Sequence, residues 1–357
     1  MNMPTAEGAA LSRRPDSLRD QGLERLKEGL RRDFGPVCLA ALNDPKVIEV
    51  MLNPDGRVWV DRLGEGMHDT GFRMPMSQSM KLFTTVASLL GTVVNAENPI
   101  LEGELPLDGS RFEGLISPIV GQPAFAIRKK ATLVFTLEDY RDKQILTSIA
   151  DPINQHRRKE VSFSEMAKGK SHYDIIKLAI ELRKNILVVG STGSGKTTLV
   201  NAILEGIARL TCEHRIVLIE DTGEIQCTAQ NYVQLRSCDR VDMTRLLRAT
   251  MRLRPDRIVV GEVRGGEALA LLKAWNTGHP GGLATVHAND CEAGLIRLEQ
   301  LIQESVEVVN PQLIAEAVDL VIFIEKEEVI TVGRKVRELA VVEGFDHETR
   351  RYRIQRV

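Results

Sequence analysis

The sequence predicts an α/β protein of two domains, in which a mostly parallel sheet with helices on both faces is preceded by a smaller α+β domain. The first observation is the stretch GSTGSGKTT, Gly190 to Thr198, which lies between the apolar runs 186–189 and 199–204 and predicts strand, loop and helix. The second is the alternation of apolar strands with helical patterns beyond Asp174, which is typical of a covered parallel sheet. The third is the length of 357 residues, which favours two cores over one.

Residues 1–140 are expected to form the smaller domain, in which about the first 16 residues are disordered because they carry no apolar periodicity. Apolar residues from Ser17 to Phe34 recur at close to helical spacing among balanced charges, which predicts a surface helix. The other expected elements are a hairpin of Val47–Leu52 and Arg57–Val60, a helix from about Ser77 to Val94, and strands at Arg111–Ile116 and Ala124–Arg128. Together they predict a small antiparallel sheet with accompanying helices.

Residues 141–171 are expected to be a linker that carries short helices, since the composition there becomes polar and basic with few core positions. The larger domain, residues 172–357, is expected to hold a mostly parallel sheet and a closing hairpin. The strands are Ile186–Val189, Arg215–Ile219, Arg257–Val260, Leu283–Val286 and Leu320–Ile324, and the hairpin joins Val336–Val342 to Arg351–Ile354.

The composition restricts the classes of function. With 47 basic and 49 acidic residues the net charge is −2, and only 4% of the residues are aromatic, so direct nucleic-acid binding is not expected. Five cysteines without a CxxC pair argue against a disulfide framework or a zinc site and suit a reducing cytoplasm. No apolar run approaches the roughly 18 residues of a spanning helix, which limits any membrane contact to the periphery.

The stretch GSTGSGKTT matches the phosphate-binding pattern GxxxxGK[ST] in full. Its glycines let the backbone turn tightly enough to aim N–H groups inward, and the following helix adds its positive end. Lys196 is expected to contact the β- and γ-phosphates of a nucleotide, and the Thr197 hydroxyl is expected to bind Mg²⁺. The expected nucleotide-binding residues are Gly190, Ser191, Thr192, Gly193, Ser194, Gly195, Lys196, Thr197 and Thr198.

Polar residues follow the next strands, at the edge where a parallel sheet binds its ligand. Glu262 is the first candidate to hold Mg²⁺, through water, or to activate the attacking water, and Glu220 is the second. Asp221 and Glu224 share a loop with Glu220, and for them a functional role and a solvated one are equally favoured. His287 ends a strand in the sequence Thr-Val-His, which favours sensing of the γ-phosphate or orientation of water over a structural role.

Four motifs, taken in order, resemble those of one family. GSTGSGKT, IEDTGEI, RLRPDRIVVGEVRGGEAL and TGHPGGLATVHAND are similar to the Walker A motif, Asp box, Walker B motif and His box of the type II/type IV secretion ATPases. The resemblance is strong over the larger domain, looser over the smaller one, and greatest to the conjugal transfer members. Gly261-Glu262 replaces the usual acidic pair of Walker B, as it does in this family.

The resemblance implies a RecA-like P-loop ATPase domain and an N-terminal domain that closes over the nucleotide. It also implies a homohexameric ring that hydrolyses ATP with Mg²⁺ in the bacterial cytoplasm, peripheral to the inner membrane, and drives inner-membrane components of a conjugation or type IV secretion apparatus. Family members place N-terminal arginines against the γ-phosphate, and the segments around Arg111 and Arg128 resemble theirs. By this analogy both arginines join the catalytic candidates.

Other interpretations remain open from the sequence. A type IV pilus or type II secretion ATPase, for assembly or retraction, belongs to the same family, but the wording TGHPGGLATVHAND and the short N-terminal domain favour conjugation. A RecA-like DNA-binding ATPase would need loops that interleave basic and aromatic residues, which the composition disfavours. A GTPase is disfavoured because no NKxD motif occurs.

Overall fold

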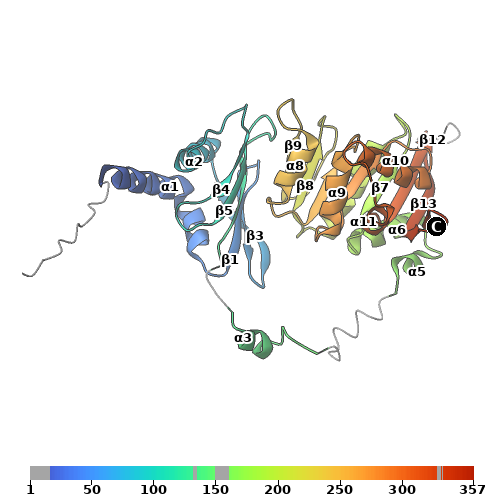
Figure 1. The fold of residues 1–357 in the computed structure, drawn as a ribbon, viewed down its shortest axis with the longest axis horizontal. Coiled ribbons are helices and arrows are strands. Elements are labelled where there is room, and N and C mark those ends of the chain that lie inside the picture. The colour runs from blue at the N-terminus through green and yellow to red at the C-terminus, as the bar shows by residue number, and fades with distance from the viewer. Residues whose placement is uncertain (1–16, 132–134, 149–160, 328–330, 332) are drawn as a thin grey trace, which may run out of the picture.

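The computed structural model describes residues 17–131, 135–148, 161–327, 331 and 333–357, and it contains two sheet-based units that lie side by side (Figure 1). The stretch expected to be disordered, residues 1–16, lies outside the described residues. Helix α3 (Leu137–Asp142) lies below the first unit, and α5 (Phe163–Ala167) lies at the far end of the second (Figure 1). Within the described residues, no helix combines the length and the apolar character needed to cross a membrane.

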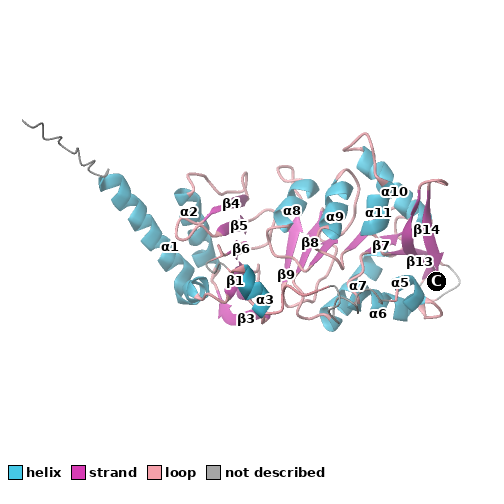
Figure 2. Ribbon diagram, turned by 60° about the horizontal axis from the view of Figure 1, so that its bottom comes forward, coloured by secondary structure: helices cyan, strands magenta, loops and turns pink. Residues whose placement is uncertain are grey.

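The N-terminal unit is a six-stranded sheet of order β3-β2-β1-β6-β5-β4, in which every neighbouring pair is antiparallel. Helices α1 and α2 pack against each other beside this sheet, and the beginning of α1 projects away from the body of the protein (Figure 2). The elements are α1 (Ser17–Asn43), β1 (Val47–Leu52), β2 (Arg57–Arg62), β3 (Gly66–Arg73), α2 (Met76–Leu89), β4 (Ile100–Glu104), β5 (Arg111–Leu115) and β6 (Ala124–Arg128).

The helices and strands expected in this unit are present, with three differences. Helix α2 ends at Leu89, before the expected end at Val94. Helix α1 continues beyond Phe34 to Asn43 through a kink at Gly35. This glycine has a φ of 72° and directly precedes Pro36. Strands β3 and β4 are not predicted by the sequence. Strand β3 carries few apolar residues and is largely exposed, so only its pairing with β2 identifies it.

The two faces of the N-terminal sheet bury different surfaces, because successive side chains of a strand point to opposite sides. In β1, Val50 joins the core formed with α1 and α2, whereas Met51 joins a core shared with the C-terminal unit. In β6, Ile127 and Ala126 divide in the same way. The sheet is therefore a layer between its own helices and the larger unit.

The C-terminal unit is an eight-stranded sheet of order β14-β13-β12-β7-β11-β10-β8-β9. The six neighbouring strands β12, β7, β11, β10, β8 and β9 are parallel to one another. Strands β13 and β14 extend the sheet beyond β12 as antiparallel strands. The elements are α6 (His172–Glu181), β7 (Ile186–Val189), α7 (Lys196–Leu210), β8 (Ile216–Glu220), β9 (Tyr232–Arg236), α8 (Met243–Thr250), β10 (Arg257–Val260), α9 (Glu267–Asn276), β11 (Leu283–Val286), α10 (Cys291–Gln303), α11 (Pro311–Ala317), β12 (Leu320–Lys326), β13 (Arg334–Asp346) and β14 (Arg351–Arg356).

Helices cover both faces of this sheet, as the sequence predicts. In β7, Val188 faces the core formed with α6 and α7, and Leu187 faces the core formed with α8 to α11. The five expected strands and the closing hairpin are all present, whereas β9 is an additional edge strand. The five cysteines are free thiols in this structure.

A buried arginine joins the two units. Arg215, just before β8, is fully buried, and its Nη1 donates to the side-chain oxygens of Asn53 and Asn231, each at 2.5 Å. Burial lowers the pKa of this guanidinium to about 10, so it remains charged at neutral pH. The N-terminal unit also covers the edge strand β9, because the N–H of Arg236 donates to the carbonyl of Ile119 at 2.8 Å.

Two buried carboxyls near this junction predict a pH dependence of stability. Burial raises the pKa of Glu49 and of Glu113 from 4.5 to about 7, although Arg252 lies 3.4 Å from Glu113. The folded state therefore keeps protons that the unfolded chain releases above pH 4.5. The free energy of unfolding falls as the pH rises toward 7, and above pH 7 the whole of this loss is present.

We predict that Glu113→Gln raises the midpoint of thermal unfolding at pH 8 and changes it little at pH 5. A lower midpoint at pH 8 would contradict this account.

Candidate nucleotide site

The phosphate loop connects the end of β7 to the start of α7, as the sequence predicts. Gly195 precedes α7 with a φ of 102°, in the left-handed region that favours glycine. A Cβ at Gly190 would lie 2.3 Å from the carbonyl oxygen of Ile324 on β12, so only glycine fits there. The loop is held between α7 and β12, and the N–H groups of the first turn of α7 are available to an anion.

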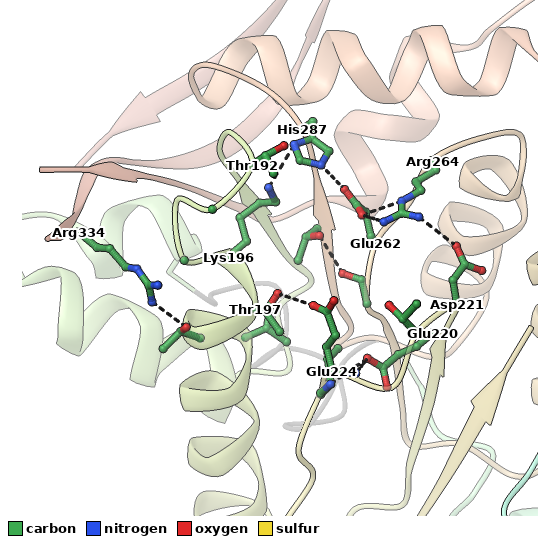
Figure 3. A pocket seen from close by; sticks show the side chains of 18 residues that line it. Thr192, Lys196, Thr197, Glu220, Asp221, Glu224, Glu262, Arg264, His287 and Arg334 are labelled. Atoms are coloured by element: carbon green, nitrogen blue, oxygen red, sulfur yellow. Dashed lines mark hydrogen bonds and ion pairs between the residues drawn. The ribbon is translucent and has the colours of Figure 1, made fainter. Parts of the chain in front are cut away.

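The Lys196 ammonium is bound by acceptors of the protein itself. Its Nζ donates to the carbonyl oxygens of Gly190 at 2.9 Å and Ser191 at 3.0 Å. It also lies 3.2 Å from Nδ1 of His287 (Figure 3). Burial lowers the pKa of Lys196, and the nearby charge of Glu262 opposes that shift. A partly desolvated ammonium on neutral acceptors gains from exchanging them for phosphate oxygens, because charge-assisted hydrogen bonds are stronger.

His287 connects Lys196 to Glu262. Because Nδ1 accepts from the lysine, the ring proton lies on Nε2, which faces Oε1 of Glu262 at 2.5 Å. Glu262 also accepts from Nε of Arg264 at 2.7 Å, and Nη1 of Arg264 lies 3.6 Å from Oδ2 of Asp221. These five side chains form one connected series of contacts across the site (Figure 3).

Both carboxylate oxygens of Glu220 accept hydrogen bonds from residues that follow it in the chain. Its Oε1 accepts from the backbone N–H groups of Glu224 at 3.1 Å and Ile225 at 2.9 Å, and its Oε2 accepts from the side chain of Gln234 at 2.6 Å. Glu224 is exposed instead, and its carboxylate accepts from the hydroxyl of Thr197 at 3.4 Å. Of these two acidic residues, Glu224 is therefore the one that faces the hydroxyl expected to bind Mg²⁺.

Most of the expected site residues surround one cavity of about 450 Å³. The loop contributes Thr192, Gly193, Gly195, Lys196, Thr197 and Thr198, and the ends of the neighbouring strands contribute Glu220, Glu262 and His287. Gly190, Ser191 and Ser194 are not among the lining residues, and Ser194 is buried. Thr285 of β11 also lines the cavity.

The site fits Mg²⁺ only together with a phosphate. The oxygens of Thr197 and Glu224 converge, and oxygen is the ligand type that this ion prefers. In the part of the chain that the structure describes, no three His, Cys, Asp or Glu side chains gather as a metal site. A magnesium ion at Thr197 would therefore take its remaining ligands from phosphate oxygens and water.

Arg111 and Arg128 lie at a different place. They are Cα partners in the β5–β6 ladder, and both line a separate cavity of about 500 Å³ between the two units. Arg128 is exposed, and its Nε lies 3.8 Å from a carboxylate oxygen of Glu49. Neither arginine lines the phosphate cavity of its own chain, so their catalytic role remains a prediction.

Two further arginines line the phosphate cavity without having been predicted from the sequence. Arg264 follows Glu262 by two positions. This spacing indicates a site residue only when the end of β10 is known. Arg334 comes from β13, and its Nη1 donates to Oγ1 of Thr198 at 2.9 Å. No motif signals Arg334, because it reaches the loop from an antiparallel hairpin beyond the last parallel strand.

Comparison with known proteins gives the class of protein to which this site belongs. Residues 38–327 match the family described as "Type II/IV secretion system protein", and the chain belongs to this family. The conjugal transfer protein TrbB of Rhizobium radiobacter is 45% identical over 321 residues, which cover 90% of this chain and 91% of the relative. These findings confirm the resemblance in the four motifs.

More distant relatives agree with this assignment. The type IV secretion system protein VirB11 of Bartonella quintana is 30% identical over 285 residues, covering 74% of this chain and 79% of the relative. Among solved structures, the VirB11 ATPase of the Brucella suis type IV secretion system, in complex with sulphate, superimposes with a TM-score of 0.78. It is 25% identical, and the match covers 90% of this chain and 97% of that chain.

The contacts of Glu220 predict a structural role that a substitution can test. Glu220→Gln replaces one acceptor oxygen with an amide donor, which then faces either the N–H groups of Glu224 and Ile225 or the side-chain amide of Gln234. We expect a loss of about 1–3 kcal/mol in the free energy of unfolding, because a buried donor loses its partner. Denaturant unfolding measures this loss, and Glu224→Gln serves as the exposed control. Equal stabilities of the two variants would show that Glu220 does not order the loop.

Proposed function

We propose that this chain is the ATP-hydrolysing motor of a conjugative type IV secretion apparatus. The observation that carries the proposal is the contact series from Lys196 through His287 to Glu262, beside a complete phosphate loop. Similarity to a conjugal transfer protein and to VirB11 proteins supports this apparatus over a pilus motor or a DNA-dependent ATPase. The reaction is the hydrolysis of ATP to ADP and phosphate.

The residues of the cavity divide the reaction among them. The β- and γ-phosphates bind the loop N–H groups, and Lys196 leaves its carbonyl acceptors to neutralise the charge that grows on the transferring group. Glu262, held by Arg264, accepts the proton of the attacking water, and His287 orients that water through Nδ1, which accepts a hydrogen bond once the lysine has left it. Thr197, with Glu224 and Glu262 through water, would hold Mg²⁺, which would supply neutralisation of the phosphate charge.

The active form in this proposal is a homohexameric ring of RecA-like domains, bound from the cytoplasm to inner-membrane components of the apparatus. The family membership supports this assembly, and a ring has a physical basis, since a heterologous interface repeated by rotation closes on itself. The net charge of −2 adds little repulsion between subunits. Light scattering with a non-hydrolysable ATP analogue tests the ring, and a monomer at micromolar concentration would contradict it.

Arg111 and Arg128 keep a proposed role in this assembly. Two guanidinium groups directly opposite each other in a ladder attract an anion, although a phosphate there would compete with Glu49, which lies 3.8 Å from Arg128. The γ-phosphate of a nucleotide is such an anion, and it becomes accessible to these residues only when the N-terminal unit moves or when a neighbouring subunit brings its own site. Loss of turnover in Arg128→Ala with retained ATP binding would support this role, and full turnover would remove it.

Two substitutions separate binding from chemistry. Lys196→Ala is expected to weaken ATP binding and abolish hydrolysis, because the lysine charge acts on both the ground-state phosphates and the transition state. Glu262→Gln keeps the shape of the side chain but removes its charge, so ATP is expected to bind while turnover falls by about a hundredfold or more. Nucleotide titration and phosphate release measure the two effects. Unchanged phosphate release by Lys196→Ala would exclude the proposed reaction at this site.

A further inference from the structure

The hairpin of β12 and β13 brings two cations to the phosphate loop. Lys326 is the last residue of β12 and Arg334 the first of β13, and the two are Cα partners in the antiparallel ladder. Both side chains are exposed. Among the described residues, neither forms an ion pair with a carboxylate within 4.0 Å.

This pairing is unfavourable without an additional partner, because like charges directly opposite each other in a ladder destabilise it. The next pair of the same ladder joins opposite charges, Glu325 and Lys335, and Arg337 is ion-paired with both Glu325 and Glu327. Among the described residues, the ion pairs of this hairpin thus involve Arg337, whereas Lys326 and Arg334 have no carboxylate within 4.0 Å. An anion between them would relieve the repulsion.

The positions of the two side chains indicate where that anion binds. The guanidinium of Arg334 lies over the first turn of α7, where it donates to Thr198 Oγ1 at 2.9 Å and lines the phosphate cavity (Figure 3). A Cβ at Gly193 would lie 3.5 Å from Nζ of Lys326, so this lysine borders the loop itself. Lys196 and His287 occupy the other side of the loop, toward Glu262. The cavity thus has cations on two sides.

We propose that Lys326 and Arg334 form a second cation pair that binds the nucleotide polyphosphate, with Arg334 contacting the phosphate next to Thr198. In a phosphate loop the first turn of the helix holds the phosphates nearer the nucleoside, whereas the loop lysine reaches the β- and γ-phosphates. Arg334 therefore acts on phosphates that ATP and ADP share. It binds substrate and product alike and takes no part in bond cleavage.

The inference extends the proposed function, and it predicts a particular kinetic pattern. Arg334→Gln is expected to weaken binding of Mg-ADP and of inorganic tripolyphosphate about tenfold and to raise KM for ATP by the same factor. The value of kcat is expected to stay within about twofold, because an interaction made equally in ground and transition states does not change it. Lys326→Gln is expected to shift the same quantities less, since Lys326 does not line the cavity.

Calorimetric titration of the full chain with Mg-ADP, beside steady-state phosphate release, provides the test. Arg337→Gln is the matched control, because Arg337 lies on the same strand but is paired with two carboxylates and does not line the cavity. The ADP affinity of this variant is expected to be unchanged. Equal ADP affinity of Arg334→Gln and the wild type would overturn the inference, and so would a loss of kcat at unchanged KM. The two proposals can fail separately. If the wild type releases no phosphate from ATP but Arg334→Gln still binds ADP more weakly than the wild type, the proposed hydrolysis is refuted and the cation pair is supported.

Discussion

The bond of the Lys196 ammonium to two loop carbonyls and to His287 is the interaction on which the rest of the site depends. It fixes the tautomer of His287, which in turn directs Nε2 to Glu262, and Arg264 holds that carboxylate from the other side. Phosphate oxygens compete for the same ammonium, so filling the loop changes the hydrogen bonds of the histidine that faces Glu262. Recognition of the phosphates and control of the attacking water are thus connected through one lysine.

A second constraint is the position of the N-terminal unit on the β9 edge of the larger sheet. The buried Arg215 takes Asn53 from the N-terminal unit as an acceptor, so separating the units would remove this partner and leave Asn231 and the carbonyl of Leu253. The same contact keeps Arg111 and Arg128 at the junction between the units and away from the phosphate loop of their own chain. Any arrangement that brings these arginines to a γ-phosphate must preserve this interface or break it at considerable cost.

Local patterns predicted most of the fold and part of the site. The loop from Gly190 to Thr198 was predictable because its backbone conformation and its chemistry are encoded in consecutive residues. Strand β3 was not, since its polar residues carry no periodic apolar signal and only pairing with β2 defines it. The division of labour between Glu220 and Glu224, and the approach of Arg334, depend on tertiary contacts between distant segments, which no local spacing encodes.

The central claim is that nucleotide phosphates replace the acceptors of Lys196. A structure of the full chain with Mg²⁺ and a non-hydrolysable ATP analogue tests this claim most directly. The account predicts that the Lys196 ammonium leaves the carbonyls of Gly190 and Ser191 and contacts the β- and γ-phosphates, while Nδ1 of His287 loses its contact with that ammonium. An analogue bound in the loop with Lys196 still on both carbonyls, or bound outside the loop, would contradict it.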